Sequence, residues 1–322
     1  MSARQVALSL LVAMIVLVAF NFWLRHSLRN SVPRQLLHAL DSSRGFTHLA
    51  LGNSLMAAGF DPAVFDRYMN QGRVIAFNGA LGASSQVEHL TLLREALRRD
   101  SSIKVVIYGF FDFQLTEPVV TRNSDLIGNL AASYYLEPDL ALRFYIMSPR
   151  DRFEFEAMRH VPMLAERGAI WGKVEAMRRA MGQVGMPPVE TNRFGRATDF
   201  GLLEAQSPDA FVSECEHWSG VGDGLNKPAL EIIREAEARG AKVVIVEMPM
   251  HPFHQQHFYA LDAWHRYRNS LRTLVERNGA EYISASGWIT DPGEFADHLH
   301  LTPRGAEEFS RRLALQLRSS QD

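Results

Sequence analysis

The chain has 322 residues, of which 47% are hydrophobic and 22% charged, and a formal net charge of -2. This composition is that of a globular protein with a buried core, and a balance without basic excess argues against nucleic acid as a partner. The single cysteine excludes an intramolecular disulfide and a cysteine-rich metal site.

The N-terminal run from Val6 to Leu24 carries no charged side chain. At about 1.5 Å per residue in a helix, it is long enough to cross a hydrocarbon core of about 30 Å. A cleavable signal peptide has a similar apolar stretch, but no convincing small-x-small cleavage site precedes the basic residues that follow. We therefore expect residues 1–30 to be an uncleaved membrane anchor. The arginines after this run, counted alone, would place the rest of the chain in the cytoplasm.

Beyond a neck at residues 31–45, helical between Ser31 and Ser43, apolar strand patterns alternate with helical ones. Short apolar runs predict buried strands at residues 46–51, 74–77, 105–108, 243–248 and 282–284. Helical periodicity and capping residues predict helices at residues 62–69, 87–99, 227–239, 261–277 and 309–317. This alternation predicts a mostly parallel sheet covered on both faces.

The alternation stops between residues 113 and 224, inside a domain that we expect to span residues 46–322. This stretch predicts a mainly helical insertion or lid, with a helix over 151–181, because so long a connection without structure of its own is uncommon. Its apolar side chains, which include Phe153 and Phe155, could face a membrane or a partner. Packing onto the main domain is the commoner arrangement and is preferred here.

Two segments at opposite ends of the domain could together carry chemistry. Ser54 follows the first predicted strand, and ligands of open parallel sheets bind beyond the carboxyl ends of the strands. Asp297 and His300 lie in the loop after the last strand, where a carboxylate three residues upstream can orient the imidazole toward a serine. His298 is a rival base. Such a pattern taken alone is also compatible with ordinary surface loop residues.

Three further histidines follow the fourth predicted strand, at positions 251, 254 and 257. Their spacing would place them on one face only if the segment were helical, and neither a cysteine nor a nearby carboxylate completes a closed metal site. A loop on the substrate side is therefore preferred over a metal site, and we expect no cofactor.

Taken in order, these segments resemble the sequence blocks of the SGNH (GDSL-type) hydrolase superfamily. The sequence Gly-Asn-Ser at 52–54 corresponds to the Gly-Asp-Ser block, residues 78–84 to the glycine block, and Asp-x-x-His at 297–300 to the last block. Each motif is weak, but their ordered conjunction is more specific. The resemblance implies a flavodoxin-like three-layer α/β/α sandwich with a parallel sheet of order 2-1-3-4-5.

The resemblance also implies roles for individual residues. Ser54 would be the nucleophile, His300 the base and Asp297 the group that orients it. The backbone amides of Ser54 and Gly82 would form the oxyanion hole, and Asn53 and Asn78 are further candidates for it. The third block departs from the family pattern, because Phe111 stands where the family has an asparagine that donates to the oxyanion. Loss of one such donor typically lowers the rate by about 100- to 1000-fold.

The function that this resemblance implies is serine-dependent ester hydrolysis or O-acyl transfer on acylated cell-envelope carbohydrate. The partners would be an acyl ester or glycan substrate, the lipid bilayer through residues 6–24, and a membrane-bound acyltransferase as a further candidate. By analogy with anchored relatives, we expect a single-pass protein of the cytoplasmic membrane with its domain on the periplasmic or extracytoplasmic side. The alternative is a catalytically weak or inactive scaffold or glycan-binding subunit of a membrane acylation complex, which Phe111 favours and the pair of Asp297 and His300 opposes.

Overall fold

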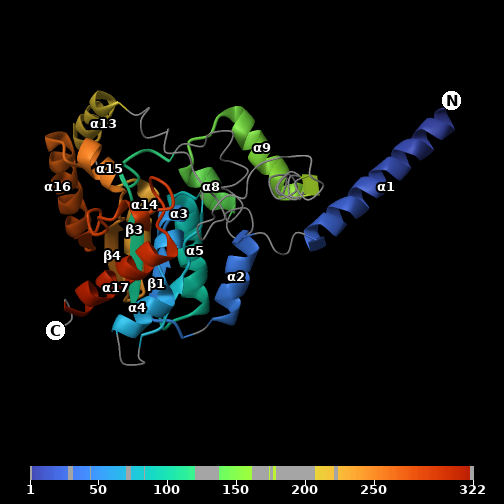
Figure 1. Cartoon of the computed structure of the whole chain (residues 1–322). Helices are drawn as coiled ribbons and strands as arrows, with labels where there is room; N and C mark the ends of the chain where they lie inside the picture. The colour runs from blue at the N-terminus through green and yellow to red at the C-terminus, as the bar shows by residue number, and fades with distance from the viewer. Residues whose placement is uncertain are drawn as a thin grey trace. The chain divides into compact units, whose positions relative to one another are not determined.

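The structure is a computed structural model, shown in Figure 1. It describes residues 2–27, 32–43, 45–69, 74–82, 84–119, 138–161, 174, 177–178, 207–220 and 224–319. The chain forms two compact units, one comprising Met1–Ala39 with Val120–Gly185 and the other Leu40–Val119 with Met186–Asp322.

The first unit contains the apolar N-terminal helix. Helix α1 spans Ala3–Ser27, and its segment Ala3–Trp23 is long and apolar enough to cross a membrane. A signal sequence near the N-terminus can meet the same criteria of length and composition. Phe20 and Trp23 stack near the end of this segment, with ring centroids 5.6 Å apart. The predicted apolar helix is thus present.

Helices α2 (Val32–Ser42), α8 (Pro138–Phe144) and α9 (Pro149–His160) follow the predicted helical character of the neck and of the insertion. A reciprocal capping box fixes the start of α9: the Ser148 hydroxyl accepts from the Asp151 amide, and the Asp151 carboxylate accepts from Ser148. Phe155 is fully buried, whereas Phe153 is 77% exposed. Most of residues 161–206, including much of the helix predicted over 151–181, lies outside the described residues.

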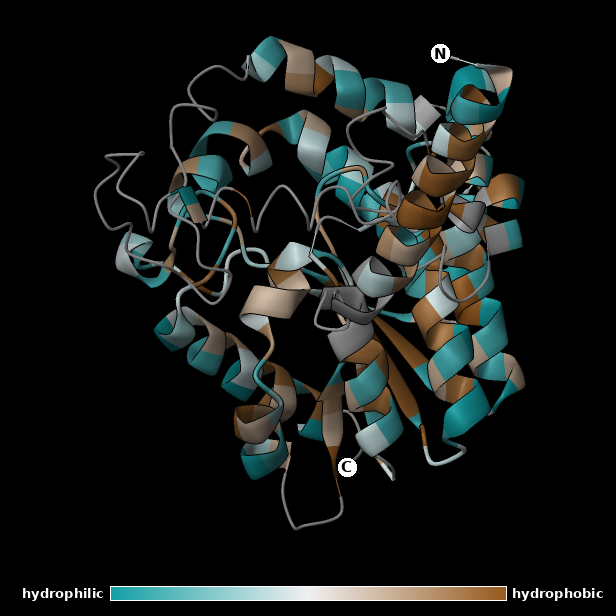
Figure 2. Ribbon diagram, turned by 90° about the vertical axis from the view of Figure 1, so that its right-hand side faces the viewer, coloured by the Kyte–Doolittle hydropathy of each residue, from teal (hydrophilic) through white to brown (hydrophobic). Residues whose placement is uncertain are grey.

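The second unit is built on a parallel sheet of five strands in the order β2-β1-β3-β4-β5. The strands are β1 (His48–Leu51), β2 (Ala76–Asn78), β3 (Val105–Phe110), β4 (Lys242–Glu247) and β5 (Glu281–Ser284). In Figure 2 the strands are hydrophobic along their length and the surrounding helices carry the hydrophilic residues. This is the pattern of a sheet covered on both faces.

The helices of this unit pack side by side in layers on the faces of the sheet. Helix α17 packs on α4 and α3, and α5 packs on α14, while α13 packs on α16. Their bounds are α3 (Ser54–Gly59), α4 (Pro62–Met69), α5 (Gln86–Arg99), α13 (Pro208–Gly220), α14 (Lys227–Ala238), α16 (Asp262–Arg277) and α17 (Pro303–Ser319). The predicted three-layer sandwich and its strand order 2-1-3-4-5 are confirmed.

A buried histidine in α5 makes the stability of this unit depend on pH. Burial lowers the pKa of His89 to about 3, and its ring nitrogens contact the Tyr108 hydroxyl at 3.0 Å and the Ser84 hydroxyl at 2.7 Å. The ring stays neutral in the folded state, whereas the unfolded chain binds a proton below a pH of about 6.5. Stability therefore rises with pH between about 3 and 6.5.

Acidification from pH 7 to pH 5 should remove about 2 kcal/mol of unfolding free energy through His89 alone. Urea unfolding of the full chain and of His89→Gln at both pH values measures this, because the variant lacks the titrating ring. We expect the loss on acidification to be smaller in the variant by about this amount. An equal loss in both proteins would contradict the assignment.

Candidate active site

Ser54 stands at a sharp turn from strand to helix. Strand β1 ends at Leu51, and Asn53 caps helix α3 through its Oδ1, which accepts from the Leu55 amide at 2.9 Å. Ser54 is therefore the first residue of the helix. This places its hydroxyl beyond the carboxyl end of strand β1, an interior strand of the sheet, where ligands of open parallel sheets bind.

The turn before Ser54 depends on a glycine. Gly52 has a φ of 148°, and a Cβ there would lie 2.8 Å from the Gly109 carbonyl oxygen and 2.8 Å from the Met56 Cβ. Since the Gly109 carbonyl belongs to strand β3, the backbone of the turn lies directly against the neighbouring strand. Only glycine fits this conformation and this space without a shift of the turn.

Substitution Gly52→Ala should accordingly lower the unfolding free energy by about 1–3 kcal/mol and displace the Ser54 hydroxyl. Urea unfolding of the full chain measures the first effect, and the rate of covalent modification of Ser54 the second. Gly287→Ala is a matched control, because Gly287 is exposed and a Cβ there meets nothing within 4 Å. Equal behaviour of the two variants would refute the role of Gly52.

Asp297 and His300 lie in a loop that closes on itself before α17. The Ala296 amide donates to the His300 carbonyl at 2.8 Å, and the Thr302 amide donates to the Glu294 carbonyl at 2.9 Å. Asp297, which is 1% exposed, accepts the backbone amides of Leu299 and His300 on Oδ1, each at 2.7 Å. The loop thus holds the carboxylate in one orientation.

The three predicted residues form a continuous hydrogen-bonded chain. The second oxygen of Asp297, Oδ2, lies 2.7 Å from His300 Nδ1, and His300 Nε2 lies 2.8 Å from Ser54 Oγ. A carboxylate only accepts hydrogen bonds, so the neutral ring carries its proton on Nδ1 and leaves Nε2 free to accept the serine proton. This is the hydrogen-bond order of a serine, a base and an orienting acid.

The rival histidine occupies another place. In the part of the chain that the structure describes, His298 makes no hydrogen bond with Ser54, and its buried Nδ1 has no hydrogen-bond partner. Burial lowers the pKa of His298, and the nearby Asp297 carboxylate partly opposes this effect. Between the two candidate bases, the structure brings His300 to the serine.

The candidate donors of an oxyanion hole differ in their surroundings. The loop that leads to Gly82 runs beside the Ser54 turn, because the Leu81 amide donates to the Gly52 carbonyl at 3.0 Å. The carboxamide of Asn78 is engaged elsewhere: its NH2 donates to carbonyls at the end of α3, with the shortest bond at 2.8 Å to Phe60. Asn78 therefore closes helix α3, and we omit it from the oxyanion donors.

The loop after β3, where the family asparagine is replaced, is held by Asp112. Asp112 has a φ of 44°, which is uncommon for a residue with a side chain. Its carboxylate accepts the Tyr259 hydroxyl at 2.6 Å, and its Oδ1 lies 3.3 Å from His254 Nε2. Phe111 is half-buried. The loop is thus anchored by side chains of a later segment.

This loop also brings in a residue that the sequence did not single out. The Asn53 carboxamide nitrogen, which belongs to the neighbour of Ser54, lies 3.4 Å from the Gln114 Oε1, and both side chains are buried. The Gln114 carbonyl accepts from Asn226 at 2.9 Å, which fixes its backbone. No motif marks Gln114, because the turn at Asp112 creates the contact.

The three histidines after β4 do not converge. His251 caps the short helix α15 (Pro252–His254) through Nδ1, which accepts from the Phe253 amide at 3.1 Å. His254 is 2% exposed, and the ring of His257 stacks on Phe253 at 3.8 Å. A π-helical turn, Gln255–Tyr259, follows. Among the described residues, no group of three or more His, Cys, Asp or Glu side chains is placed to hold a metal ion.

Among known proteins, similarity to this chain was found only for solved structures. The chain is similar to a GDSL-like lipase from Bacteroides thetaiotaomicron, with 9% identity, 90% of this chain and 98% of the other covered, and a TM-score of 0.40. It is also similar to a lipase/acylhydrolase from Enterococcus faecalis, with 11% identity, 85% and 97% covered, and a TM-score of 0.39. No family model matches the chain, and no curated protein does.

These likenesses are distant, so the class of the chain rests on its own sheet order and side-chain geometry. A parallel sheet of order β2-β1-β3-β4-β5, with a serine after β1 and Asp-x-x-His after β5, is the arrangement that the resemblance to the SGNH (GDSL-type) hydrolases predicts. The predicted resemblance is confirmed at the level of the fold.

Proposed function

We propose that this protein is a serine-dependent ester hydrolase or O-acyltransferase that acts on acylated cell-envelope carbohydrate. The observation that carries the proposal is the chain of two short contacts, 2.8 Å from Ser54 Oγ to His300 Nε2 and 2.7 Å from His300 Nδ1 to Asp297 Oδ2. A serine becomes a nucleophile when a base within hydrogen-bond reach is itself oriented by a third group.

The chemistry takes place in two halves. Ser54 Oγ attacks the acyl carbonyl and its proton passes to His300 Nε2, which then protonates the departing alcohol as the carbon–oxygen bond breaks. Water or a sugar hydroxyl next attacks the acyl-enzyme, loses its proton to His300, and releases the acid or the new ester as Ser54 regains a proton. Asp297 stabilises the imidazolium in both halves without itself taking the proton.

The oxyanion of each tetrahedral intermediate would be held by the amides of Ser54 and Gly82. Asn53 remains a candidate third donor, because it directly precedes the nucleophile in the chain and, among the described residues, its carboxamide NH2 has only a long contact, 3.4 Å, with Gln114. Phe111 supports a second candidate function, since a half-buried aromatic ring offers no donor where the family has one. That alternative is a catalytically weak or inactive scaffold or glycan-binding subunit of a membrane acylation complex.

The N-terminal helix bears on where this chemistry takes place. We infer a single-pass anchor within residues 1–30, a neck over 31–45 and a hydrolase-like domain over 46–322, with 113–224 as its insertion. A domain on the periplasmic or extracytoplasmic face of the cytoplasmic membrane would meet envelope polysaccharide. A membrane-bound acyltransferase could then supply the acyl group.

Supplying the full-length protein with 4-nitrophenyl acetate tests this function and separates hydrolysis from transfer. Release of 4-nitrophenol reports acylation, and mass spectrometry of added oligosaccharide reports transfer of the acetyl group. A hydrolase yields acetate alone, and a transferase yields acetylated oligosaccharide. Release no faster than that of Ser54→Ala would favour the scaffold.

A further inference from the structure

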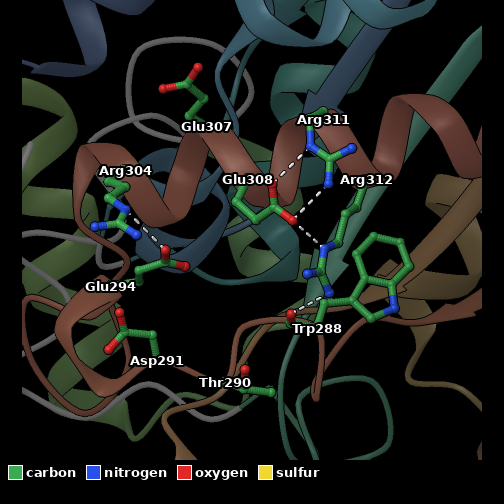
Figure 3. A pocket seen from close by; sticks show the side chains of 9 residues that line it. All are labelled: Trp288, Thr290, Asp291, Glu294, Arg304, Glu307, Glu308, Arg311 and Arg312. Carbon is green, nitrogen blue, oxygen red and sulfur yellow. Dashed lines mark hydrogen bonds and ion pairs between the residues drawn. The ribbon is translucent and has the colours of Figure 1, made fainter.

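A groove runs beside the first half of α17, and Figure 3 shows the side chains that line it. It lies between residues 288–294 and residues 304–312, and we call it the Trp288 groove. Its hollow has a volume of about 460 Å³, and a second hollow of about 350 Å³ adjoins it, since Trp288, Arg311 and Arg312 line both. Together the two hollows form an elongated surface, which suits a polymeric ligand.

Ion pairs hold part of the lining in place. Glu294 pairs with Arg304 at 3.2 Å, and Glu308 pairs with Arg311 at 2.8 Å and with Arg312 at 2.5 Å (Figure 3). The hydrogen bond from Arg311, followed by that from Arg312, lowers the pKa of Glu308 to about 2, so this carboxylate is ionised at neutral pH. All three guanidinium groups of the lining are therefore already paired with carboxylates.

Other oxygen-bearing side chains of the groove take no part in these ion pairs. In the described part of the chain, the Glu307 carboxylate and the Thr290 hydroxyl have no side-chain partner, and Asp291 uses only Oδ1, which accepts the Gly293 amide at 2.8 Å. The lining of the larger hollow contains four carboxylates and three guanidinium groups. An anionic ligand would meet this surplus of negative charge, so a neutral or cationic ligand fits better.

Trp288 supplies a fixed aromatic surface in the middle of the groove. It is half-buried, its ring centroid lies 6.1 Å from that of the buried Phe309, and its carbonyl accepts from Arg312 Nη1 at 2.6 Å. An indole packs against the apolar C–H face of a sugar ring, while neighbouring carboxylates accept hydrogen bonds from its hydroxyls. We propose that the Trp288 groove binds a polysaccharide chain of neutral sugars or amino sugars.

The groove adjoins the loop that carries Asp297 and His300. The Glu294 carbonyl accepts from both the Thr302 amide, at 2.9 Å, and the Thr302 hydroxyl, at 3.1 Å, and so closes the stem of that loop. Two residues separate Glu294 from Asp297, so these positions lie at most about 11 Å apart along the extended chain. A bound polymer can therefore present an ester to Ser54 while its remote part stays in the groove. This link rests on the proposed function, and it narrows the substrate to uncharged or amino-sugar chains.

Binding can be tested without catalysis. Isothermal titration of the full-length Ser54→Ala protein in lipid nanodiscs would use xylotetraose, a tetramer of N-acetylglucosamine and tetragalacturonate as probes. Nanodiscs avoid alkyl maltosides, whose sugar headgroups would compete. We expect saturable binding of a neutral or amino-sugar probe, weakened at least about tenfold by Trp288→Ala and less by Trp288→Phe.

Glu307→Gln should also weaken this binding, whereas Trp218→Ala, a half-buried tryptophan of α13, should leave it unchanged. The proposal is overturned if no probe binds, if only the uronate binds, or if Trp288→Ala binds as tightly as Trp218→Ala. Covalent labelling of Ser54 in the wild-type chain is measured separately. If the probe binds but Ser54 is not labelled, the proposed function is refuted and the carbohydrate-binding role of the groove is supported. If Ser54 is labelled but no probe binds, the binding role of the groove is refuted and the proposed function is supported.

Discussion

Replacing His300 by alanine is expected to lower the rate of ester hydrolysis by at least about 1000-fold. The Ser54 hydroxyl would lose the acceptor that lies 2.8 Å away, and no other base is in contact with it among the described residues. Loss of the base in a serine–histidine pair removes most of the catalytic effect, and the residual rate comes from binding and oxyanion contacts. The measurement is kcat/KM for 4-nitrophenyl acetate with the full-length protein.

The matched control is His298→Ala, which removes a histidine of the same loop. We expect it to keep kcat/KM within about threefold of the wild type, because its ring is not joined to the serine. Circular dichroism of both variants checks that the fold is retained. A His300→Ala protein with more than a tenth of wild-type activity, or equal losses in the two variants, would exclude His300 as the base.

The second large effect concerns stability. Arg268→Ala is expected to lower the unfolding free energy by about 3–5 kcal/mol, because it leaves a buried carboxylate without its cation. Glu247 is fully buried at the end of β4, and its Oε1 accepts from Arg268 at 2.9 Å. Its Oε2 accepts the hydroxyls of Ser284 at 2.6 Å and Tyr282 at 3.1 Å, which fix the carboxylate but carry no charge.

Urea unfolding followed by tryptophan fluorescence measures this loss, since Trp264 lies in the same layer and the Arg268 guanidinium sits 5.6 Å from its ring. Arg98→Ala is the control: its side chain is 68% exposed, and an exposed pair contributes at most about 1 kcal/mol. In the double variant Arg268→Ala/Glu247→Gln, part of the stability should return because the unpaired charge is gone. A loss below about 1 kcal/mol for Arg268→Ala would contradict this account.

The layers of the domain could be predicted from the sequence because buried parallel strands are continuous apolar runs. The run at 243–248 matches β4 within one residue, and Asp61 with Pro62 marks the first turn of α4. The Asp61 carboxylate does accept the amide of Ala63, at 2.9 Å, as a cap should. Such signals are local, so they are visible without any knowledge of the fold.

Other features of the site depend on contacts between distant segments. A tight turn makes Ser54 the first residue of helix α3, whereas the sequence pattern predicted only the strand before it. Asn78 was a candidate oxyanion donor, yet its carboxamide reaches the carbonyls of α3. Gln114 meets Asn53 only because Asp112 reverses the chain. Much of the predicted insertion lies outside the described residues, so its apolar stripe stays a prediction.

The activation of Ser54 is the central claim, and a fluorophosphonate probe tests it most directly. The full-length protein would be treated with the probe in lipid nanodiscs and digested, and the modified residue identified by mass spectrometry. Labelling of Ser54 that disappears in His300→Ala is the predicted result, because only a deprotonated hydroxyl attacks the phosphorus at an appreciable rate. An unlabelled Ser54 in a folded protein, or equal labelling with and without His300, would contradict it.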